Sequence, residues 1–99
     1  MKLDYEISEF AKEDIEQIWQ FTYEKWSRTQ ADRYFKLIVS EFKFLVKNPE
    51  IGRRIDYIKK DHRVRNIKSH IIVYKIKNEK IWIDRILHKN MDLEFKLGK

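Results

Sequence analysis

The side chains best suited to acid–base chemistry lie in the second half of the chain. The imidazole of His88 could accept or donate a proton, while Arg65 and Arg85 could hold an anionic group beside it. The alternation of side chains along the last strand-like segment, however, puts Arg85 and His88 on opposite faces unless a bulge intervenes. We therefore favour a second interpretation, in which His88 is a turn residue whose hydrogen bonds hold Met91 and Asp92 in place.

Metal and cofactor chemistry has little support in the sequence. The chain has no cysteine, which excludes disulfides and thiolate metal sites. Its three histidines, His62, His70 and His88, are dispersed and have no second ligand at helical spacing. We expect no metal and no other cofactor.

Positive charge is concentrated in the second half of the sequence. Residues 1–50 carry a net charge of −2 and residues 51–99 one of +8, which together give +6. Such a local field suits nucleic acid or an acidic protein partner, although a solvated surface is the plainer interpretation. The densest stretch contains only two acidic residues, Asp56 and Asp61. Its basic residues are Arg53, Arg54, Lys59, Lys60, Arg63, Arg65 and Lys68.

Length and composition predict one compact domain over residues 1–99. The hydrophobic fraction of 42% supports one core and leaves no room for a second. No apolar run approaches the roughly 18 residues of a membrane-spanning helix, and the first residues alternate instead of forming a signal peptide. We expect a soluble, cytoplasmic protein without membrane contact.

Hydrophobic periodicity predicts an α+β domain of order β-α-α-β-β-β, with a helical hairpin on a small, mostly antiparallel sheet. A strand is expected up to Ile7, then a helix from the N-cap Ser8 to about Trp26 and a second from Ser27 that stops before Asn48-Pro49. Further strands are expected at about 64–68, 70–77 and 80–88, and a short helix or a frayed end at 93–99. Asn78-Glu79 is short enough for a two-residue hairpin, although it lacks glycine.

The predicted sheet and the predicted helices both carry more apolar residues than one buried face requires. The last two strands are apolar on both faces, so we expect central strands or a sheet partly covered on both sides. The surplus on the helices either closes into the core or leaves a groove where a partner segment docks. This surplus comprises Phe10, Phe21, Tyr23, Tyr34, Leu37 and Phe44.

Three motifs, together with the order of elements, resemble the toxins of the RelE/ParE superfamily, most closely the ParE branch. The resemblance spans essentially the whole chain. The motifs are the turn Asn48-Pro49-Glu50-Ile51-Gly52-Arg53, the run from Arg65 through His70 to Tyr74, and the stretch from Ile83 through Arg85-Ile86-Leu87-His88 to Met91-Asp92.

The resemblance implies a partner, a small antitoxin with its own DNA-binding domain. The flexible C-terminal segment of such an antitoxin typically wraps the helix pair and the sheet, folding as it binds. On this basis Trp19, Trp26 and Tyr34 are the expected antitoxin-binding residues. An acidic antitoxin would best complement the basic half of the chain.

The resemblance also implies two alternative activities for the free protein. Members of the ParE branch inhibit DNA gyrase by protein contact without catalysis, which we favour and which would make this chain no enzyme. Members of the RelE branch cut messenger RNA on the ribosome; here Arg65, Arg85 and His88 would form the site, but no tyrosine follows Tyr74, where those ribonucleases commonly have one. A non-toxic binding or co-repressor derivative is the third alternative. The expected toxicity and target-binding residues are Arg53, Arg65, Arg85, His88, Met91 and Asp92.

Overall fold

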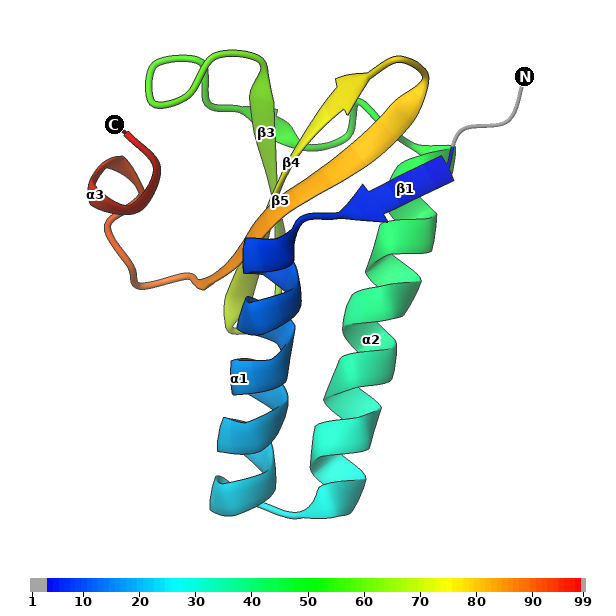
Figure 1. The fold of residues 1–99 in the computed structure, drawn as a ribbon, viewed down its shortest axis with the longest axis vertical. Coiled ribbons are helices and arrows are strands. Elements are labelled where there is room, and N and C mark those ends of the chain that lie inside the picture. The colour runs from blue at the N-terminus through cyan, green and yellow to red at the C-terminus, as the bar shows by residue number, and fades with distance from the viewer. Residues whose placement is uncertain (1–3, 99) are drawn as a thin grey trace.

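The fold is an α+β domain in which two long helices pack on one side of a five-stranded sheet (Figure 1). The computed structural model describes residues 4–98; residues 2 and 3 of the expected first strand and residue 99 of the expected tail lie outside them. The elements are β1 (Asp4–Ile7), α1 (Glu9–Lys25), α2 (Arg28–Lys47), β2 (Arg53–Arg54), β3 (His62–Ile67), β4 (His70–Lys77), β5 (Lys80–His88) and α3 (Leu93–Leu97). None of the helices within residues 4–98 is long and apolar enough to cross a membrane.

The helical hairpin follows directly from two serine caps. Ser8 Oγ accepts a hydrogen bond from the backbone N–H of Ala11 at 3.0 Å, and Ser27 Oγ accepts one from that of Gln30 at 3.1 Å. Because only Trp26 and Ser27 separate the helices, α2 must turn back along α1. The predicted antiparallel pair is confirmed.

The strands lie in the order β1-β5-β4-β3-β2, with β1 parallel to β5 and every other pair antiparallel. The third strand of the chain runs over 62–67, so the expected range of 64–68 is wrong by two residues at its start. Pairing with β4 extends it back to His62, and Lys68 leaves it with a left-handed φ of 52°. The two-residue hairpin is confirmed: Asn78 and Glu79 both adopt left-handed φ values, 53° and 58°.

Apolar side chains cover the sheet on both faces, as the sequence predicts. The larger core lies under the helices and the smaller one under the 55–61 loop and α3, which explains why β4 and β5 carry apolar residues on both faces. Members of the larger core include Ile38, Phe42, Leu45, Ile72, Tyr74, Ile81, Ile83 and Ile86; those of the smaller core are Ile55, Val64, Ile71, Val73, Leu87 and Leu97.

The surplus of apolar side chains on the helices is only partly buried. The turn of the hairpin projects well beyond the ends of the strands, so the sheet cannot cover the last turns (Figure 1). Phe10 and Phe21 are 66% and 63% exposed, and Tyr23 and Trp26 are also exposed. Of the two interpretations, the structure thus favours an open apolar surface over complete closure.

The hydroxyl of Tyr74 holds the turn after α2. It accepts a hydrogen bond from the N–H of Gly52 at 2.9 Å and donates one to the carbonyl of Pro49 at 2.8 Å. A Cβ on residue 52 would lie 2.5 Å from this hydroxyl, so only glycine fits there. The turn motif is therefore built around the buried tyrosine.

We expect Tyr74→Phe to lower the free energy of unfolding by about 1–3 kcal/mol, because it leaves two backbone groups without a partner inside the protein. Urea denaturation of wild type and variant measures the difference. Tyr57→Phe is the control, since Tyr57 is 72% exposed and its loss should change the stability little. Equal stability of Tyr74→Phe and wild type would contradict this role for the hydroxyl.

Candidate functional site

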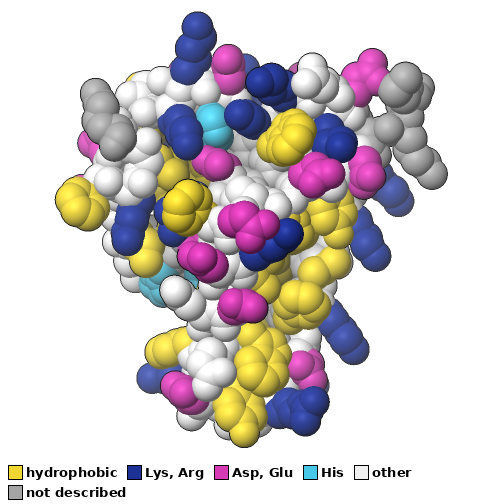
Figure 2. Space-filling view, viewed as in Figure 1, with side chains coloured by type: hydrophobic (Ala, Val, Ile, Leu, Met, Phe, Trp, Pro, Cys, Tyr) yellow, Lys and Arg dark blue, Asp and Glu magenta, His cyan; other side chains and the backbone are white. Residues whose placement is uncertain are grey.

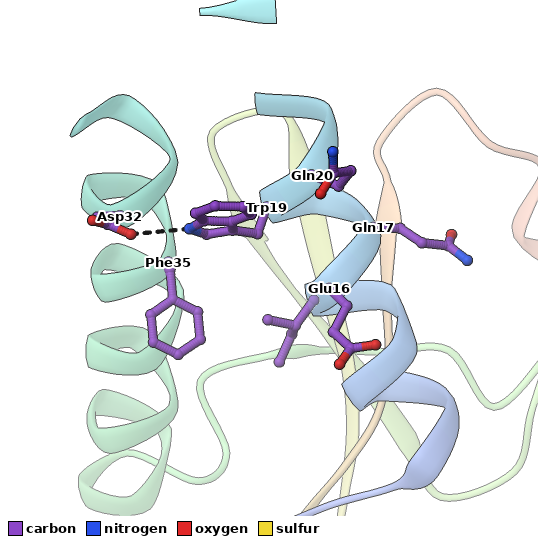
Figure 3. A pocket seen from close by; sticks show the side chains of 7 residues that line it. Glu16, Gln17, Trp19, Gln20, Asp32 and Phe35 are labelled. Carbon is purple, nitrogen blue, oxygen red and sulfur yellow. Dashed lines mark hydrogen bonds between the residues drawn. The ribbon is translucent and has the colours of Figure 1, made fainter. Parts of the chain in front are cut away.

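Hollows flank α1 on two faces of that helix. The first, here called the interhelical groove, lies between α1 and α2 (Figure 3) and is lined by Ile15, Glu16, Gln17, Trp19, Gln20, Asp32 and Phe35. The second, here called the histidine cleft, consists of two adjoining hollows that share Phe21, His70 and His88. Its other lining residues include Asp14, Trp26, Tyr34, Arg85, Met91 and Lys96.

Trp19 dominates the interhelical groove. Its indole reaches from α1 towards α2, where Nε1 donates a hydrogen bond to Oδ1 of Asp32 at 3.0 Å (Figure 3). The ring also stacks on Tyr23, with centroids 5.3 Å apart and planes 7° from parallel. Phe35 completes an apolar floor, while Glu16 and Asp32 make the groove acidic. Such a groove can hold an apolar segment that carries basic side chains at its margin.

The space-filling view shows the same mixture of apolar and acidic side chains on the surface of the hairpin (Figure 2). Hydrophobic side chains gather over the helical hairpin, with acidic side chains among them, while Lys and Arg lie mostly around the margin (Figure 2). The positive charge predicted for the second half of the chain is thus largely absent from the middle of this face. The apolar and acidic middle of this face and its basic margin suit chemically different parts of a partner.

A β-bulge at Asp84 rearranges the last long strand. Val73 pairs with Arg85 and Tyr74 pairs with Ile83, so Asp84 has no partner residue on β4. This bulge is the exception under which Arg85 and His88 were expected to share a face: the extra residue shifts the alternation, and both line the histidine cleft. For the same reason Ile81, Ile83 and Ile86 share the core beneath the helices, although the unbroken alternation grouped Ile86 with Asp84.

The bulge is held from both sides of the sheet. Ser8 Oγ donates a hydrogen bond to the carbonyl of Asp84 at 2.7 Å, which ties the bulge to the start of α1. The carboxylate of Asp84 lies 2.9 Å from Lys59 Nζ and 3.5 Å from Nε2 of the buried His62. These contacts also anchor the 55–61 loop over the smaller core.

Arg85 is fixed by Asp14 of α1. Its Nε and Nη2 donate to the two carboxylate oxygens at 2.8 and 3.0 Å, and the N–H of Ile86 donates to the same carboxylate at 2.9 Å. The hydrogen bond to Asp14 raises the pKa of Arg85 above its usual value. Asp14 was not predicted as a site residue, because it lies 71 positions from Arg85 and looks like an ordinary acidic residue near the helix start.

Two histidines meet in the cleft because they are paired across β4 and β5. The rings of His70 and His88 have centroids 5.4 Å apart, so the expectation that the histidines are dispersed is wrong for this pair. His70 Nδ1 lies 2.7 Å from the hydroxyl of Tyr34. Burial, and then the neighbouring His88, lower the pKa of His70 to about 4, so it is neutral at neutral pH. Within residues 4–98 no group of three or more His, Asp or Glu residues is placed to hold a metal ion.

The end of β5 forms the polar turn that the sequence suggested. His88 Nδ1 accepts a hydrogen bond from the N–H of Asn90 at 3.2 Å, and the carbonyl of His88 accepts one from that of Met91 at 3.0 Å. Asp92 then caps α3, with Oδ1 accepting from the N–H of Glu94 at 3.0 Å. Met91 is exposed beside this turn.

The predicted basic residues are not brought together. Arg65 on β3 pairs with Glu41 of α2 and lies over the ring of Phe44, whereas Arg85 pairs with Asp14 of α1. Arg53 is exposed on the edge strand β2. Among the expected partner-binding residues, Trp19 lies in the interhelical groove, and Trp26 and Tyr34 line the histidine cleft.

Known proteins share this arrangement. A solved structure described as the chromosomal ParDE toxin–antitoxin system from P. aeruginosa matches with a TM-score of 0.77 at 17% identity, covering 88% of this chain and 96% of that one. The toxin–antitoxin complex RelBE2 from Mycobacterium tuberculosis matches with a TM-score of 0.70 at 13% identity, covering 90% of this chain and 100% of that one. The fold is thus that of the ParE and RelE toxin structures.

The sequence comparisons narrow this class to one family. The model of the ParE toxin of the type II toxin–antitoxin system parDE matches residues 5–93. Toxin ParE1 of Mycobacterium tuberculosis is 33% identical over 95 residues, and Toxin ParE1 of Caulobacter vibrioides is 26% identical over 94; both alignments cover 95% of this chain and 97% of the relative. The chain belongs to the ParE toxin family of type II toxin–antitoxin systems.

Proposed function

We propose that this toxin is neutralised by a cognate antitoxin and, when free, inhibits DNA gyrase in the cytoplasm by protein contact. The observation that carries the proposal is the match of residues 5–93 to the ParE toxin model, which covers both long helices and, apart from Asp4 of β1, every strand. The resemblance of the motifs to the ParE branch supplies the target. The interhelical groove and the histidine cleft support the proposed binding of these partners.

The antitoxin binds along the helical hairpin. The interhelical groove with Trp19 accepts an apolar part of the antitoxin segment, and basic side chains of that segment meet Glu16 and Asp32. Where the segment passes Trp26 and Tyr34 it enters the histidine cleft. Acidic parts of the antitoxin complement the basic half of the toxin. Folding of a flexible segment on these surfaces would cover the exposed aromatic rings.

A contact mechanism fits the state of the arginines better than catalysis does. Arg65 and Arg85 are each paired with a carboxylate from a helix, so neither charge is free to stabilise a reacting phosphate. Arg53, Met91 and His88 are exposed. We assign target contact to these exposed residues, with Asp92 positioning the turn and the paired arginines supporting the surface.

A ribosome-dependent mRNA endonuclease remains the second candidate, because the bulge at Asp84 places Arg85 and His88 in one cleft. His88 would then act as the acid or base and Arg85 would contact phosphate. The pairing of Arg85 with Asp14, and the location of Arg65 on the far side of β4, weigh against a joint catalytic role.

Controlled induction of this chain in bacteria without antitoxin separates the candidates. We expect DNA synthesis, followed by pulse labelling over the first minutes, to fall before protein synthesis does. A first fall in protein synthesis that His88→Ala abolishes would replace the gyrase proposal with the endonuclease. If neither synthesis changes while the antitoxin still binds, the chain is a non-toxic binding or co-repressor derivative.

A further inference from the structure

A second charged surface lies far from the helical turn, at the end of the sheet where β3 begins and β4 ends (Figure 1). Here a hollow, called the basic hollow below, is lined almost entirely by polar and charged residues. The lining residues are Glu50, Arg54, Lys60, Asp61, His62, Arg63, Lys75, Ile76 and Lys77. A protein seated on the hairpin would leave this hollow open.

Most of the positive charge in the basic hollow is uncompensated. Arg54 is neutralised locally, since it pairs with Asp56 and lies 3.6 Å from Asp61. Among residues 4–98 the guanidinium of Arg63 donates only to backbone carbonyls, those of Glu50 at 3.1 Å and Gly52 at 2.8 Å, so no described carboxylate compensates its charge.

The lysines of the basic hollow add to this charge. Lys60, Lys75 and Lys77 form no salt bridge with any residue of the described chain, 4–98. With Arg63 they make four cations, against Glu50 and one of the two carboxylates, Asp56 and Asp61, that share Arg54. A hollow of this charge attracts polyanions.

The composition of the basic hollow favours phosphate over a protein surface as its ligand. Protein interfaces depend on buried aromatic or aliphatic anchors, and Ile76 is the only apolar residue among the lining residues. Single-stranded nucleic acid is held by aromatic side chains on which its bases stack, and the lining residues include none apart from the buried His62. A duplex backbone needs only cations at suitable places.

We propose that the basic hollow binds the phosphate backbone of duplex nucleic acid without reading its sequence. Arg63 is held in place by the two carbonyls and fixes the contact, while Lys60, Lys75 and Lys77 neutralise neighbouring phosphates. Because this surface is separate from the interhelical groove and the histidine cleft, the toxin can contact DNA while either of them is occupied. The contact is independent of the proposed gyrase inhibition.

Fluorescence anisotropy of a labelled DNA duplex of arbitrary sequence tests the proposal with the full chain. We expect a dissociation constant of about 10⁻⁴ to 10⁻⁶ M at physiological salt, as is usual for binding without sequence preference. In the triple variant Lys60→Ala, Lys75→Ala, Lys77→Ala, the slope of log affinity against log salt should become shallower by about 2–3, since each lost phosphate contact removes about 0.9.

The control is the triple variant Lys36→Ala, Lys43→Ala, Lys47→Ala, which removes the same charge from the exposed surface of α2. It should keep the wild-type salt slope. If the salt slope of the control fell by the same amount, the effect would come from net charge alone and the proposal would be overturned. Absence of DNA binding by the wild type would also overturn it. Equally tight binding of an acidic poly-glutamate peptide of matched charge would assign the hollow to a protein partner instead. Thermal unfolding of both variants verifies that they fold.

Discussion

Replacing Asp14 with alanine should lower the free energy of unfolding by about 2–4 kcal/mol, one of the largest effects available to a single substitution in this chain. The carboxylate of Asp14 is only 11% exposed and accepts three hydrogen bonds, two from Arg85 and one from the N–H of Ile86. The variant leaves the 24% exposed Arg85 without its counter-charge and the N–H of Ile86 without an acceptor. Urea denaturation followed by circular dichroism measures the change.

Two further variants test whether the lost ion pair causes the loss of stability in Asp14→Ala. Glu13→Ala removes the neighbouring carboxylate, which is exposed, and should change stability by less than about 0.5 kcal/mol. The double variant Asp14→Ala, Arg85→Met should be more stable than the sum of the single changes predicts, because the uncompensated charge is gone. If Asp14→Ala is as stable as Glu13→Ala, the pair does not hold α1 on the sheet.

Much of the fold could be predicted from the sequence because the signals are local. Ser8 and Ser27 provide the oxygen atoms that cap the two helices, and each helix begins at the residue after its serine. The hairpin at Asn78 and Glu79 was predicted without glycine from the β-branched strands beside it, and the strands indeed impose the left-handed backbone. In each case the determining interactions lie within a few residues.

The site depends on interactions that no local pattern contains. The bulge at Asp84 is fixed by Ser8, 76 positions away, and by Lys59 and His62. A strict period of two therefore assigned Ile86 and its neighbours to the wrong faces. The sequence does carry one usable signal: Ile83 and Ile86 are separated by two polar residues, which is the spacing that a single inserted residue produces in a half-buried strand.

Burial and exposure of the aromatic residues also required the structure. Periodicity indicated a surplus of apolar residues on the helices but could not say whether the sheet reaches them. The hairpin is longer than the strands beneath it (Figure 1). Phe21 and Trp26 therefore remain exposed, whereas Tyr34 reaches back to His70. The length difference between helices and strands therefore determines which residues can contact a partner.

Phe35→Glu should abolish neutralisation by the antitoxin while leaving the toxin folded and toxic. Phe35 lies in the interhelical groove and is 43% exposed, so its replacement costs little packing in the free protein. In the complex, a glutamate beside Glu16 and Asp32 would remove an apolar anchor and bury a third negative charge. We expect a loss of at least about 2 kcal/mol in antitoxin binding, roughly 30-fold in the dissociation constant.

Co-induction of toxin and antitoxin measures the effect as growth, and calorimetry on the purified proteins gives the affinities. Ser40→Glu is the matched control, because it adds the same charge to an exposed position of α2 outside the groove. The control should be neutralised like wild type, since its charge lies away from the antitoxin.

Neutralisation of Phe35→Glu at wild-type affinity would place the antitoxin elsewhere, and the histidine cleft with Trp26 would then be its remaining docking surface. Loss of toxicity in Phe35→Glu, with the fold intact, would instead assign the groove to the target, because one apolar surface between two helices can serve either partner.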